Sequence, residues 1–301
     1  MQIDIDTRMV TLLGKPLGQS FAARMQNAAY EAAGLNMLYY YTEVGAEHLG
    51  DIINGVRYMN NHAGLAVTKP NKVEVLKYVD EIDPLCEKMG AANTIVIEGG
   101  RLKAYNTDGT GFLVSLREET GIRPEETVFF SIGAGGAGRA ICSVLAFHGA
   151  KKIYVMDAVD SAASGLVEDI NTKFAPVAEF VSFRDRQAAY RRITESDMVM
   201  NCTGIGMGSS VGKTPVPKEV LRPGQFCYDA IYNPARTRFL ADAEEVGCRT
   251  LNGLGMSLYQ GAAQIELWSG KPAPVEAMRK ELMAIVAEKN RQEETAASPR
   301  R

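Results

Sequence analysis

Residues 127–138, TVFFSIGAGGAG, decide the fold of one half of this chain. The β-branched and aromatic run up to Ile132 predicts a buried strand, and the glycines after it predict a tight turn that opens a helix. Gly133 permits the turn, Gly135 lets the backbone approach a pyrophosphate, and Gly138 lets the helix pack close to the strand. The spacing and its context therefore favour a dinucleotide-binding loop at a helix N-terminus. The residues expected to form that loop are Gly133, Ala134, Gly135, Gly136, Ala137 and Gly138.

An acidic residue follows at the position where such a fold contacts the adenosine ribose. Asp157 comes directly after a predicted strand, Lys152–Met156. A carboxylate there accepts hydrogen bonds from the ribose 2′- and 3′-hydroxyls and repels the 2′-phosphate of NADP. Asp160 adds negative charge, and no arginine occurs at residues 157–160. We therefore expect NAD rather than NADP as the cofactor, the alternative being a glycine-rich turn that serves packing only.

Short apolar runs alternate with helical patterns along most of the chain, an order typical of α/β folds with parallel sheets. Ahead of the glycine loop we expect strands at Val10–Leu13, Tyr39–Val44, Gly64–Val67, Thr94–Ile97 and Leu102–Tyr105, the last two forming a hairpin, and helices at Phe21–Ala33 and Asn71–Tyr78. After it we expect further strands at Glu179–Val181, Met198–Asn201, Gln225–Ala230 and Thr250-Leu251, and helices at Ala137–Phe147, Ala162–Phe174 and Arg236–Glu245. Asn252-Gly253-Leu254-Gly255 predicts a flexible break before helices at Ser257–Ser269 and Val275–Lys289.

Length and composition indicate a globular protein of two domains. The chain has 301 residues, of which 46% are hydrophobic and 23% charged, values that exclude a fibre or a disordered chain. A net charge of −3 without a basic stripe argues against a nucleic-acid partner. No apolar run approaches the ~18 residues that span a bilayer, and the N-terminus lacks the pattern of a signal peptide. We therefore expect a cytoplasmic protein with no membrane partner.

The cysteines and histidines do not suggest a metal site. The five cysteines are odd in number and scattered along the chain, with no pair at metal-ligand spacing. They are typical of small core residues in a reducing compartment. The three histidines, His48, His62 and His148, are also far apart in sequence, so we expect no metal.

Seven motifs in order give the chain a resemblance to the shikimate/quinate dehydrogenase family over about residues 9–288. Seven matches in the same order are far more specific than any one of them. They are Gly14-Lys15-Pro16-Leu17-Gly18-Gln19-Ser20, Val67-Thr68-Lys69-Pro70-Asn71-Lys72, Gly90-Ala91-Ala92-Asn93-Thr94, Asn106-Thr107-Asp108-Gly109, Asn201-Cys202-Thr203-Gly204-Ile205-Gly206-Met207, Asp229-Ala230-Ile231-Tyr232-Asn233-Pro234, and Gly253-Leu254-Gly255-Met256 leading to Gln260-Gly261-Ala262.

The resemblance implies both an architecture and an activity. It implies an N-terminal α/β substrate domain (1–110) completed by C-terminal helices (252–290), with a Rossmann domain that binds NAD (111–251) between them. We expect the tail 291–301, which is charged and lacks apolar periodicity, to be disordered. Enzymes of this family reversibly oxidise one ring hydroxyl of a cyclohexane or cyclohexene carboxylate to a ketone. A homodimer is compatible with the resemblance, and the oligomeric state stays open.

The same resemblance assigns roles to individual residues. Lys72 and Asp108 match the catalytic pair, and the reaction needs one, because the hydroxyl proton must leave as the hydride departs. The positions implied to contact the substrate are Ser20, Thr68, Asn93, Tyr232 and Gln260. The positions implied to contact the cofactor, besides the glycine loop and Asp157, are Thr203, Met207, Gly253 and Met256.

Two positions depart from the family pattern. Where the family carries two serines that bind the substrate carboxylate, this chain keeps Ser20 but has Ala22, and Ala66 replaces an asparagine that contacts ring hydroxyls. Each missing hydrogen-bond partner costs ~1–3 kcal/mol. Three interpretations stay open: a quinate/shikimate dehydrogenase with a rearranged carboxylate site, a related dehydrogenase for another cyclitol or hydroxy acid, and a non-catalytic NAD(H)-binding regulator. The joint presence of Lys72, Asp108 and Gln260 argues against the regulator.

Overall fold

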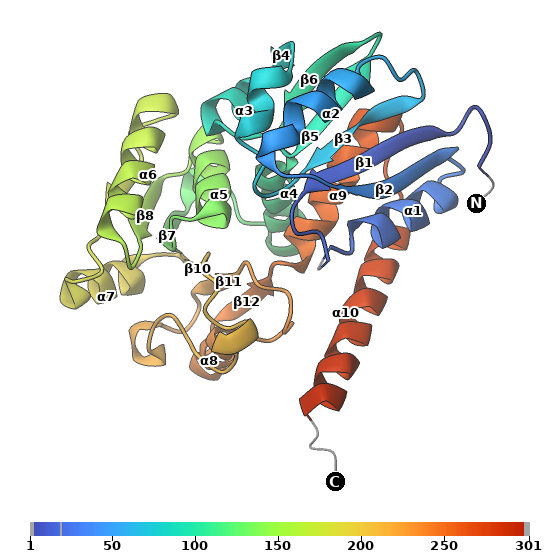
Figure 1. The fold of residues 1–301 in the computed structure, drawn as a ribbon. Coiled ribbons are helices and arrows are strands. Elements are labelled where there is room, and N and C mark those ends of the chain that lie inside the picture. Colours follow the sequence, from blue (N-terminus) through green and yellow to red (C-terminus); the bar gives the residue numbers. More distant parts are fainter. Residues whose placement is uncertain (1–2, 19, 298–301) are drawn as a thin grey trace. The chain divides into compact units, whose positions relative to one another are not determined.

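The computed structural model describes residues 3–18 and 20–297 and has the predicted α/β architecture (Figure 1). The chain divides into two compact units. The first contains Met1–Gly111 and Leu258–Arg291, and the second contains Phe112–Ser257 together with Gln292–Arg301, so that most of the last helix belongs to the first unit. The N-terminal segment thus shares its unit with helices from the C-terminal end. Each unit has its own six-stranded sheet.

The first unit contains a mixed sheet with the strand order β2-β1-β3-β5-β6-β4. Its strands are β1 (Arg8–Gly14), β2 (Met37–Glu43), β3 (His62–Val67), β4 (Glu81–Ile82), β5 (Thr94–Glu98) and β6 (Arg101–Tyr105). The sheet is not purely parallel, because β5 runs antiparallel to both β3 and β6. The predicted hairpin of β5 and β6 is confirmed, and it turns at Gly99 and Gly100, whose φ angles of +56° and +79° suit a tight turn made of glycines.

Helices of the first unit cover this sheet. They are α1 (Ala22–Ala32), α2 (Leu49–Val56), α3 (Pro84–Met89), the start of α4 (Thr107–Thr120), most of α9 (Leu254–Ser269), and α10 (Val275–Ala297). The helix predicted at Asn71–Tyr78 is wrong in type and length, since residues up to Val73 form a turn and only Glu74–Tyr78 are helical, as a 3₁₀ helix. The buried apolar core includes Leu13, Leu49, Ile53, Leu65, Val75 and Ile95.

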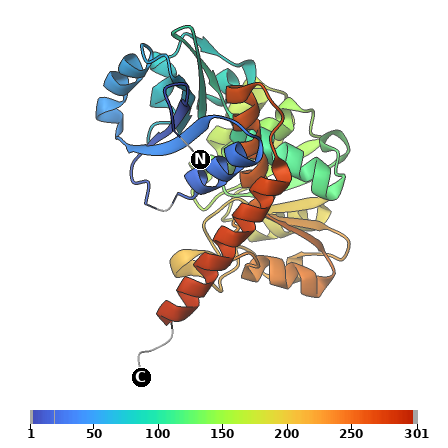
Figure 2. The same cartoon turned by 90° about the vertical axis from the view of Figure 1, so that its right-hand side faces the viewer.

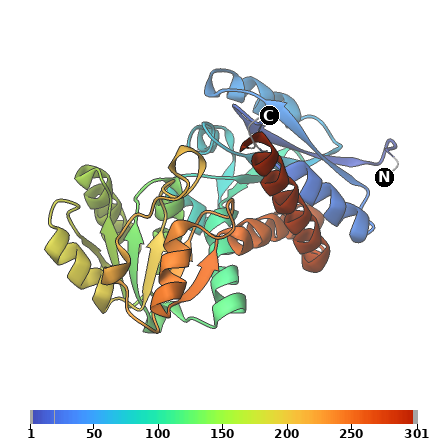
Figure 3. The same ribbon diagram turned by 90° about the horizontal axis from the view of Figure 1, so that it is seen from below.

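The second unit is a Rossmann-type layer structure with the parallel strand order β12-β11-β10-β7-β8-β9. The strands are β7 (Val128–Ile132), β8 (Lys152–Met156), β9 (Ala178–Phe180), β10 (Met198–Asn201), β11 (Phe226–Asp229) and β12 (Arg249–Asn252). The flanking helices are α5 (Gly136–Phe147), α6 (Asp160–Lys173), α7 (Arg186–Glu195) and α8 (Arg238–Val246), and Figure 3 shows helices on both faces. The strand order reverses between β7 and β10, the place where such sheets bind ligands.

Two predictions near the C-terminus need correction. The break expected at residues 252–255 is absent, because β12 ends at Asn252 and α9 begins at Leu254. A Cβ at Gly253 would overlap the Ala230 carbonyl oxygen, so this glycine serves close packing rather than flexibility. The tail expected to be disordered from residue 291 is helical to Ala297 in α10, which lies beside α1 in Figure 2, and residues 298–301 lie outside the described residues. Arg24 on α1 pairs with Glu281 and Glu288 on α10, at 2.8 and 2.6 Å.

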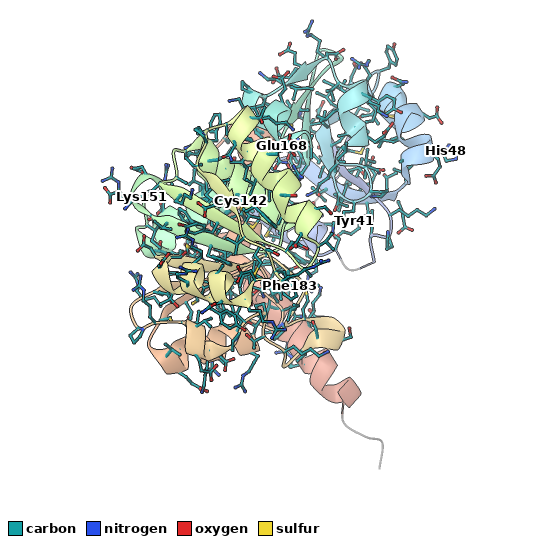
Figure 4. The ribbon with its side chains drawn as sticks, turned by 90° about the vertical axis from the view of Figure 1, so that its left-hand side faces the viewer. Tyr41, His48, Cys142, Lys151, Glu168 and Phe183 are labelled. Atoms are coloured by element: carbon teal, nitrogen blue, oxygen red, sulfur yellow. The ribbon has the colours of Figure 1, made fainter. Side chains whose placement is uncertain are left out.

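The cysteines behave as predicted. All five are free and buried in the apolar interior, with Cys142 on α5 labelled in Figure 4. In the described part of the chain, no helix combines the length and apolarity required to cross a membrane.

Candidate active site

The structure brings the predicted catalytic pair together in the first unit. Lys72 Nζ lies 2.6 Å from Asp108 Oδ2, and the two side chains are 29% and 20% exposed. A fully buried pair would be closed to a substrate, and a fully exposed one would be weakened by solvent. The Lys72–Asp108 ion pair is short, and both side chains are still partly exposed to solvent.

The topology of the first sheet explains why Lys72, Asn93 and Asp108, which belong to three separate motifs, lie close together. Lys72 follows the end of β3, Asn93 precedes β5, and Asp108 follows the end of β6. Because β5 is antiparallel to both neighbours, its first residues lie beside the last residues of β3 and β6. The Ala92 N–H donates to the Lys72 carbonyl at 2.8 Å, which ties the lysine turn to the segment before β5.

Asn93 lies behind the pair rather than on the surface. Its side chain is buried, and Nδ2 donates to Asp108 Oδ1 at 2.9 Å. Its Oδ1 accepts the Thr107 backbone N–H at 2.8 Å. An amide nitrogen could not accept that N–H, so this bond fixes the orientation of the asparagine and directs Nδ2 toward Asp108. Both carboxylate oxygens of Asp108 therefore receive an N–H donor from the protein.

A second asparagine fixes the backbone of Asp108. Asn106 Oδ1 accepts the Asp108 N–H at 3.1 Å at the start of α4, and Asn106 Nδ2 donates to the Ala91 carbonyl at 2.8 Å. The motif Asn106-Thr107-Asp108-Gly109 indicated a role for Asp108, but it did not indicate that Asn106 caps this helix. A side chain that satisfies a free N–H at a helix N-terminus is the usual capping arrangement.

The other predicted substrate contacts are divided between the units. Ser20, Thr68 and Gln260 are half-buried in the first unit, whereas Tyr232 belongs to the second, where burial raises the pKa of its phenol to about 12. Ser20 Oγ accepts the Ala22 N–H at 3.3 Å. Ala66 is fully enclosed in β3, so its small side chain leaves no exposed space of its own.

Tyr41, labelled in Figure 4, is a residue that the sequence did not suggest. Its hydroxyl donates to the Ser20 carbonyl at 3.1 Å and accepts the Ala23 N–H at 3.0 Å. Tyr41 therefore joins β2 to the start of α1 at the segment where the family serine is replaced by Ala22. The tyrosine run at residues 39–41 predicts a strand, but nothing local shows which of its tyrosines reaches this helix.

The glycine loop lies entirely in the second unit, after β7 and at the start of α5. Gly133 has φ +108° and donates its N–H to the Met156 carbonyl at 2.7 Å, a backbone conformation that favours glycine. A Cβ at Gly138 would overlap the Gly133 carbonyl oxygen, so helix and strand approach as closely as expected. A Cβ at Gly135 would meet nothing within 4 Å. The backbone at Gly135 is thus open to a phosphate group at the helix N-terminus.

Asp157 is attached to this loop, whereas Asp160 is not. Asp157 Oδ2 accepts the Ala134 N–H at 2.8 Å, and Oδ1 accepts the Val159 N–H at 2.9 Å. Asp160 instead accepts the Ser182 hydroxyl at 2.9 Å and the Phe183 N–H at 3.1 Å, in the loop that Figure 4 marks with Phe183. Of the two acids, Asp157 is therefore the one placed to act beside the glycine loop.

The remaining predicted cofactor residues follow the strands β10 and β12. Thr203 donates its hydroxyl to Asn201 Oδ1 at 2.6 Å, and Met207 is 49% exposed on the next turn. Gly253 lies against Ala230, and Met256 Sδ accepts the Tyr228 hydroxyl at 3.4 Å. Thr203 and Met207 thus come after β10, and Gly253 and Met256 come after β12, all in the second unit.

A buried carboxylate, to which the sequence assigned no role, joins two segments of this unit. Asp229, at the end of β11, accepts hydrogen bonds from Asn201 Nδ2 at 3.2 Å and from the Thr237 hydroxyl at 2.6 Å. Burial raises the pKa of Asp229, and these hydrogen bonds oppose that rise. The Asp229 side chain thus joins the end of β10 to the start of α8.

Comparison with known proteins agrees with this arrangement. A family model described as the shikimate dehydrogenase substrate binding domain matches residues 12–95, and one described as the shikimate 5'-dehydrogenase C-terminal domain matches residues 253–283. The shikimate dehydrogenase (NADP(+)) of Moorella thermoacetica is 40% identical over 92% of this chain and 93% of its own length.

Solved structures give the same result. Shikimate 5-dehydrogenase from Listeria monocytogenes, in complex with shikimate and NAD, is 38% identical with a TM-score of 0.89, over 94% of this chain and 98% of that one. The ligand-free 5-ketofructose reductase of a Gluconobacter species is 32% identical with a TM-score of 0.85, over 94% of this chain and 100% of that one. Identity of this extent along nearly the whole chain, with the motifs in the same order, places the protein in the shikimate/quinate dehydrogenase family.

Proposed function

We propose that this protein is an NAD-dependent oxidoreductase that reversibly oxidises a ring hydroxyl of a quinate- or shikimate-type ring acid. Membership of the family supports an oxidoreductase that acts on a CH–OH group with a nicotinamide cofactor. The observation that carries the proposal is the partly exposed ion pair of Lys72 with Asp108 at 2.6 Å. In this proposal the first unit binds the substrate and the second binds the cofactor.

The catalytic pair provides what the oxidation of an alcohol requires. Bound NAD supplies the hydride acceptor for the carbinol carbon. Lys72 would hydrogen-bond the reacting oxygen and stabilise the negative charge that develops on it. Asp108 would keep the ammonium in place and contact a neighbouring hydroxyl, and the hydroxyl proton would leave through this pair.

Three further residues of the first unit belong to the proposed substrate site. Ser20, Thr68 and Gln260 have polar side chains that are half-buried and therefore accessible. Each can hydrogen-bond a hydroxyl or a carboxylate oxygen. Tyr232, the fourth residue that the family resemblance implies, belongs to the second unit, and its contact with the substrate stays a prediction.

The second unit fits a dinucleotide, and Asp157 favours NAD. The open space at Gly135 and the start of α5 suit the pyrophosphate. The Asp157 carboxylate, anchored by the Ala134 and Val159 N–H groups, still has lone pairs for the ribose hydroxyls. A 2′-phosphate at the same place would meet a fixed negative charge. The Listeria relative carries NAD in its structure, while the Moorella relative is named for NADP(+).

A pair of glycine substitutions separates packing from binding in this loop. Gly138→Ala is expected to lower the free energy of unfolding by about 1–3 kcal/mol, because the added methyl group overlaps the Gly133 carbonyl. Gly135→Ala is expected to leave stability within about 0.5 kcal/mol, because its methyl group meets open space, and to weaken NAD binding. Denaturant unfolding and NAD titration measure both effects. Equal loss of stability in the two variants would contradict this description of the loop.

A second candidate function is oxidation or reduction of a different polyol or hydroxy acid. The observation that favours it is the pair Ala22 and Ala66, which removes two polar groups from the family's substrate positions. The Gluconobacter relative, a 5-ketofructose reductase by name, shows that the family includes a member named for a ketose.

A substrate panel at fixed NAD concentration tests the two candidates. Quinate, shikimate, non-carboxylated cyclitols, open-chain polyols and open-chain hydroxy acids are each incubated with purified protein, and NADH formation is followed by absorbance. Turnover of quinate or shikimate supports the first candidate. Turnover of another alcohol, with none of quinate or shikimate, supports the second. Tight NAD binding without turnover of any of them would overturn both and favour a regulator.

Restoring a serine is expected to improve recognition of the carboxylate. Ala22→Ser returns a hydroxyl to the first turn of α1, two residues after Ser20. One added hydrogen bond of ~1–1.5 kcal/mol corresponds to a KM for quinate or shikimate that is lower by about tenfold. Ala28→Ser, farther along the same helix, is the control and is expected to leave KM unchanged. If KM does not fall, or falls equally in both variants, this segment does not contact the carboxylate.

A further inference from the structure

A line of buried hydrogen bonds leads from the helices α1 and α9 to the catalytic pair. Gln26 Nε2 donates to Gln264 Oε1 at 3.2 Å, and Gln264 Nε2 donates to Thr94 Oγ1 at 2.9 Å. Thr94 Oγ1 donates to Asn93 Oδ1 at 2.8 Å, and Asn93 Nδ2 donates to Asp108 Oδ1 at 2.9 Å. The first four side chains are at most 4% exposed. The line connects α1 and α9 to the carboxylate that holds Lys72.

Backbone groups fix the direction of every bond in this line. The Gly261 carbonyl accepts from Gln26 Nε2 at 3.2 Å, and the Asn93 carbonyl accepts from Gln264 Nε2 at 3.3 Å. A carbonyl oxygen can only accept, so neither glutamine amide can be reversed. The Thr107 N–H fixes Asn93 in the same way at the other end. Each residue therefore donates toward Asp108, and hydrogen bonds aligned in one direction strengthen one another.

Such a line is costly to bury, which indicates that it has a purpose beyond packing. Taking an amide out of water costs several kcal/mol unless hydrogen bonds replace the water, and apolar side chains of similar size would avoid that cost. Gln26 Oε1 has no hydrogen-bond partner among the described residues, so part of the cost is not recovered. Gln264 and Thr94 bond to the backbone carbonyl and to Oδ1 of Asn93, whereas Asp108 accepts from Nδ2. The line therefore holds the asparagine through atoms other than the one that contacts Asp108.

We propose that Gln264 is a positioning residue for the catalytic pair. Through the Thr94 hydroxyl it holds Asn93, and Asn93 holds the Asp108 oxygen that Lys72 does not occupy. Gln264 touches neither Lys72 nor Asp108, so its effect on turnover is indirect. The inference rests on the proposed function, in which Lys72 and Asp108 carry the chemistry. It goes beyond that function by adding Gln264 and Thr94, which belong to neither the catalytic pair nor the proposed binding sites.

The physical basis is the tolerance of a catalytic arrangement to displacement. A reacting constellation must be held within about 0.5 Å to work at full rate. Asp108 Oδ1 has one donor here, Asn93 Nδ2, and the amide that carries it is held at its oxygen by the Thr107 N–H and the Thr94 hydroxyl. Loss of the Thr94 hydroxyl would leave the amide oriented by Thr107 but free to tilt. A tilt would move Nδ2 away from Asp108 Oδ1 and loosen the carboxylate beside Lys72.

The test compares two substitutions on the same face of α9. Gln264→Met keeps the size of the side chain and removes its bonds to Thr94 and Asn93. The matched control is Trp268→Phe, which removes the indole N–H bond to the Ile95 carbonyl, 2.9 Å long, one helical turn farther on. Both variants are expected to lower Tm. Only Gln264→Met is expected to lower kcat, by about tenfold, with the KM for NAD unchanged, since it removes bonds worth ~1–1.5 kcal/mol to the site.

A second pair keeps the test decisive if Gln264→Met does not fold. Thr94→Ser retains the hydroxyl and is expected to keep kcat within about twofold, whereas Thr94→Val removes it and is expected to match the loss in Gln264→Met. Turnover is measured with the alcohol that the substrate panel identifies. Equal kcat in the serine and valine variants, or a kcat loss in Trp268→Phe as large as in Gln264→Met, would overturn the inference. Lys72→Ala in the same assay distinguishes a failure of the proposed function from a failure of the inference alone. If Lys72→Ala retains turnover, the proposed function fails and the inference fails with it.

Discussion

Lys72→Ala is expected to lower kcat by about 10³-fold and to leave the Kd for NAD within about twofold. A positioned acid or base contributes ~10²–10⁴-fold to a proton transfer, and Lys72 would also stabilise the developing alkoxide. The substitution leaves Asp108 without the ammonium that lies 2.6 Å from Oδ2. NAD binding is expected to survive because the glycine loop belongs to the other unit. Steady-state kinetics and NAD titration measure the two quantities separately.

The control for this variant lies in the next helical segment. Lys77→Ala removes an exposed lysine whose Nζ pairs with Glu74 at 2.8 Å, and its kcat is expected to equal that of the unaltered protein. Pairs of this exposed kind contribute little to stability, so the control should fold normally. A loss of less than tenfold in Lys72→Ala would exclude the lysine from proton transfer, while a loss in both variants would indicate a general effect on the segment.

Asp157→Ala is expected to raise the KM for NAD by about 10- to 100-fold and to remove most of the preference over NADP. Hydrogen bonds between a charged group and a ribose hydroxyl contribute ~1.5–3 kcal/mol, which corresponds to that range. The variant also removes the negative charge that would oppose a 2′-phosphate. Because Asp157 Oδ2 accepts the Ala134 N–H, the substitution loosens the glycine loop as well. The two cofactors are compared by their kcat/KM ratios.

Asp160→Ala is the matched control for cofactor preference. Its carboxylate bonds to Ser182 and Phe183 rather than to the glycine loop, so the substitution is expected to lower Tm and to leave the NAD/NADP ratio unchanged. An unchanged ratio in Asp157→Ala would show that the ribose is recognised elsewhere. A ratio that changes equally in both variants would point to net charge rather than to a direct contact.

Most elements of the second unit could be predicted closely because their signals are local, although no helix was expected where α7 (Arg186–Glu195) lies. The strand before Gly133, the glycine spacing and the acid after β8 are all readable within residues 127–157, and the structure places Asp157 against that loop. The elements of the first unit could be predicted less closely. After β3 the sequence predicts a helix over Asn71–Tyr78, because the helical pattern of Glu74–Tyr78 extends through the three residues before it, which form a turn. Gly253 looked flexible, because sequence does not show a carbonyl packed against a glycine.

The sequence by itself determined the α/β fold, the family, and the residues Lys72 and Asp108 as a pair, since motif order and local periodicity carry that information. Only the tertiary structure decided how the pair is supported. Asn93 turned out to lie behind Asp108 because β5 runs antiparallel to β3 and β6, and strand direction is set by pairing between distant segments. Gln264 is 170 residues from Thr94 in the chain, and their hydrogen bond exists only because α9 packs against β5. Contacts of this kind depend on the packing of complete elements, which no local pattern encodes.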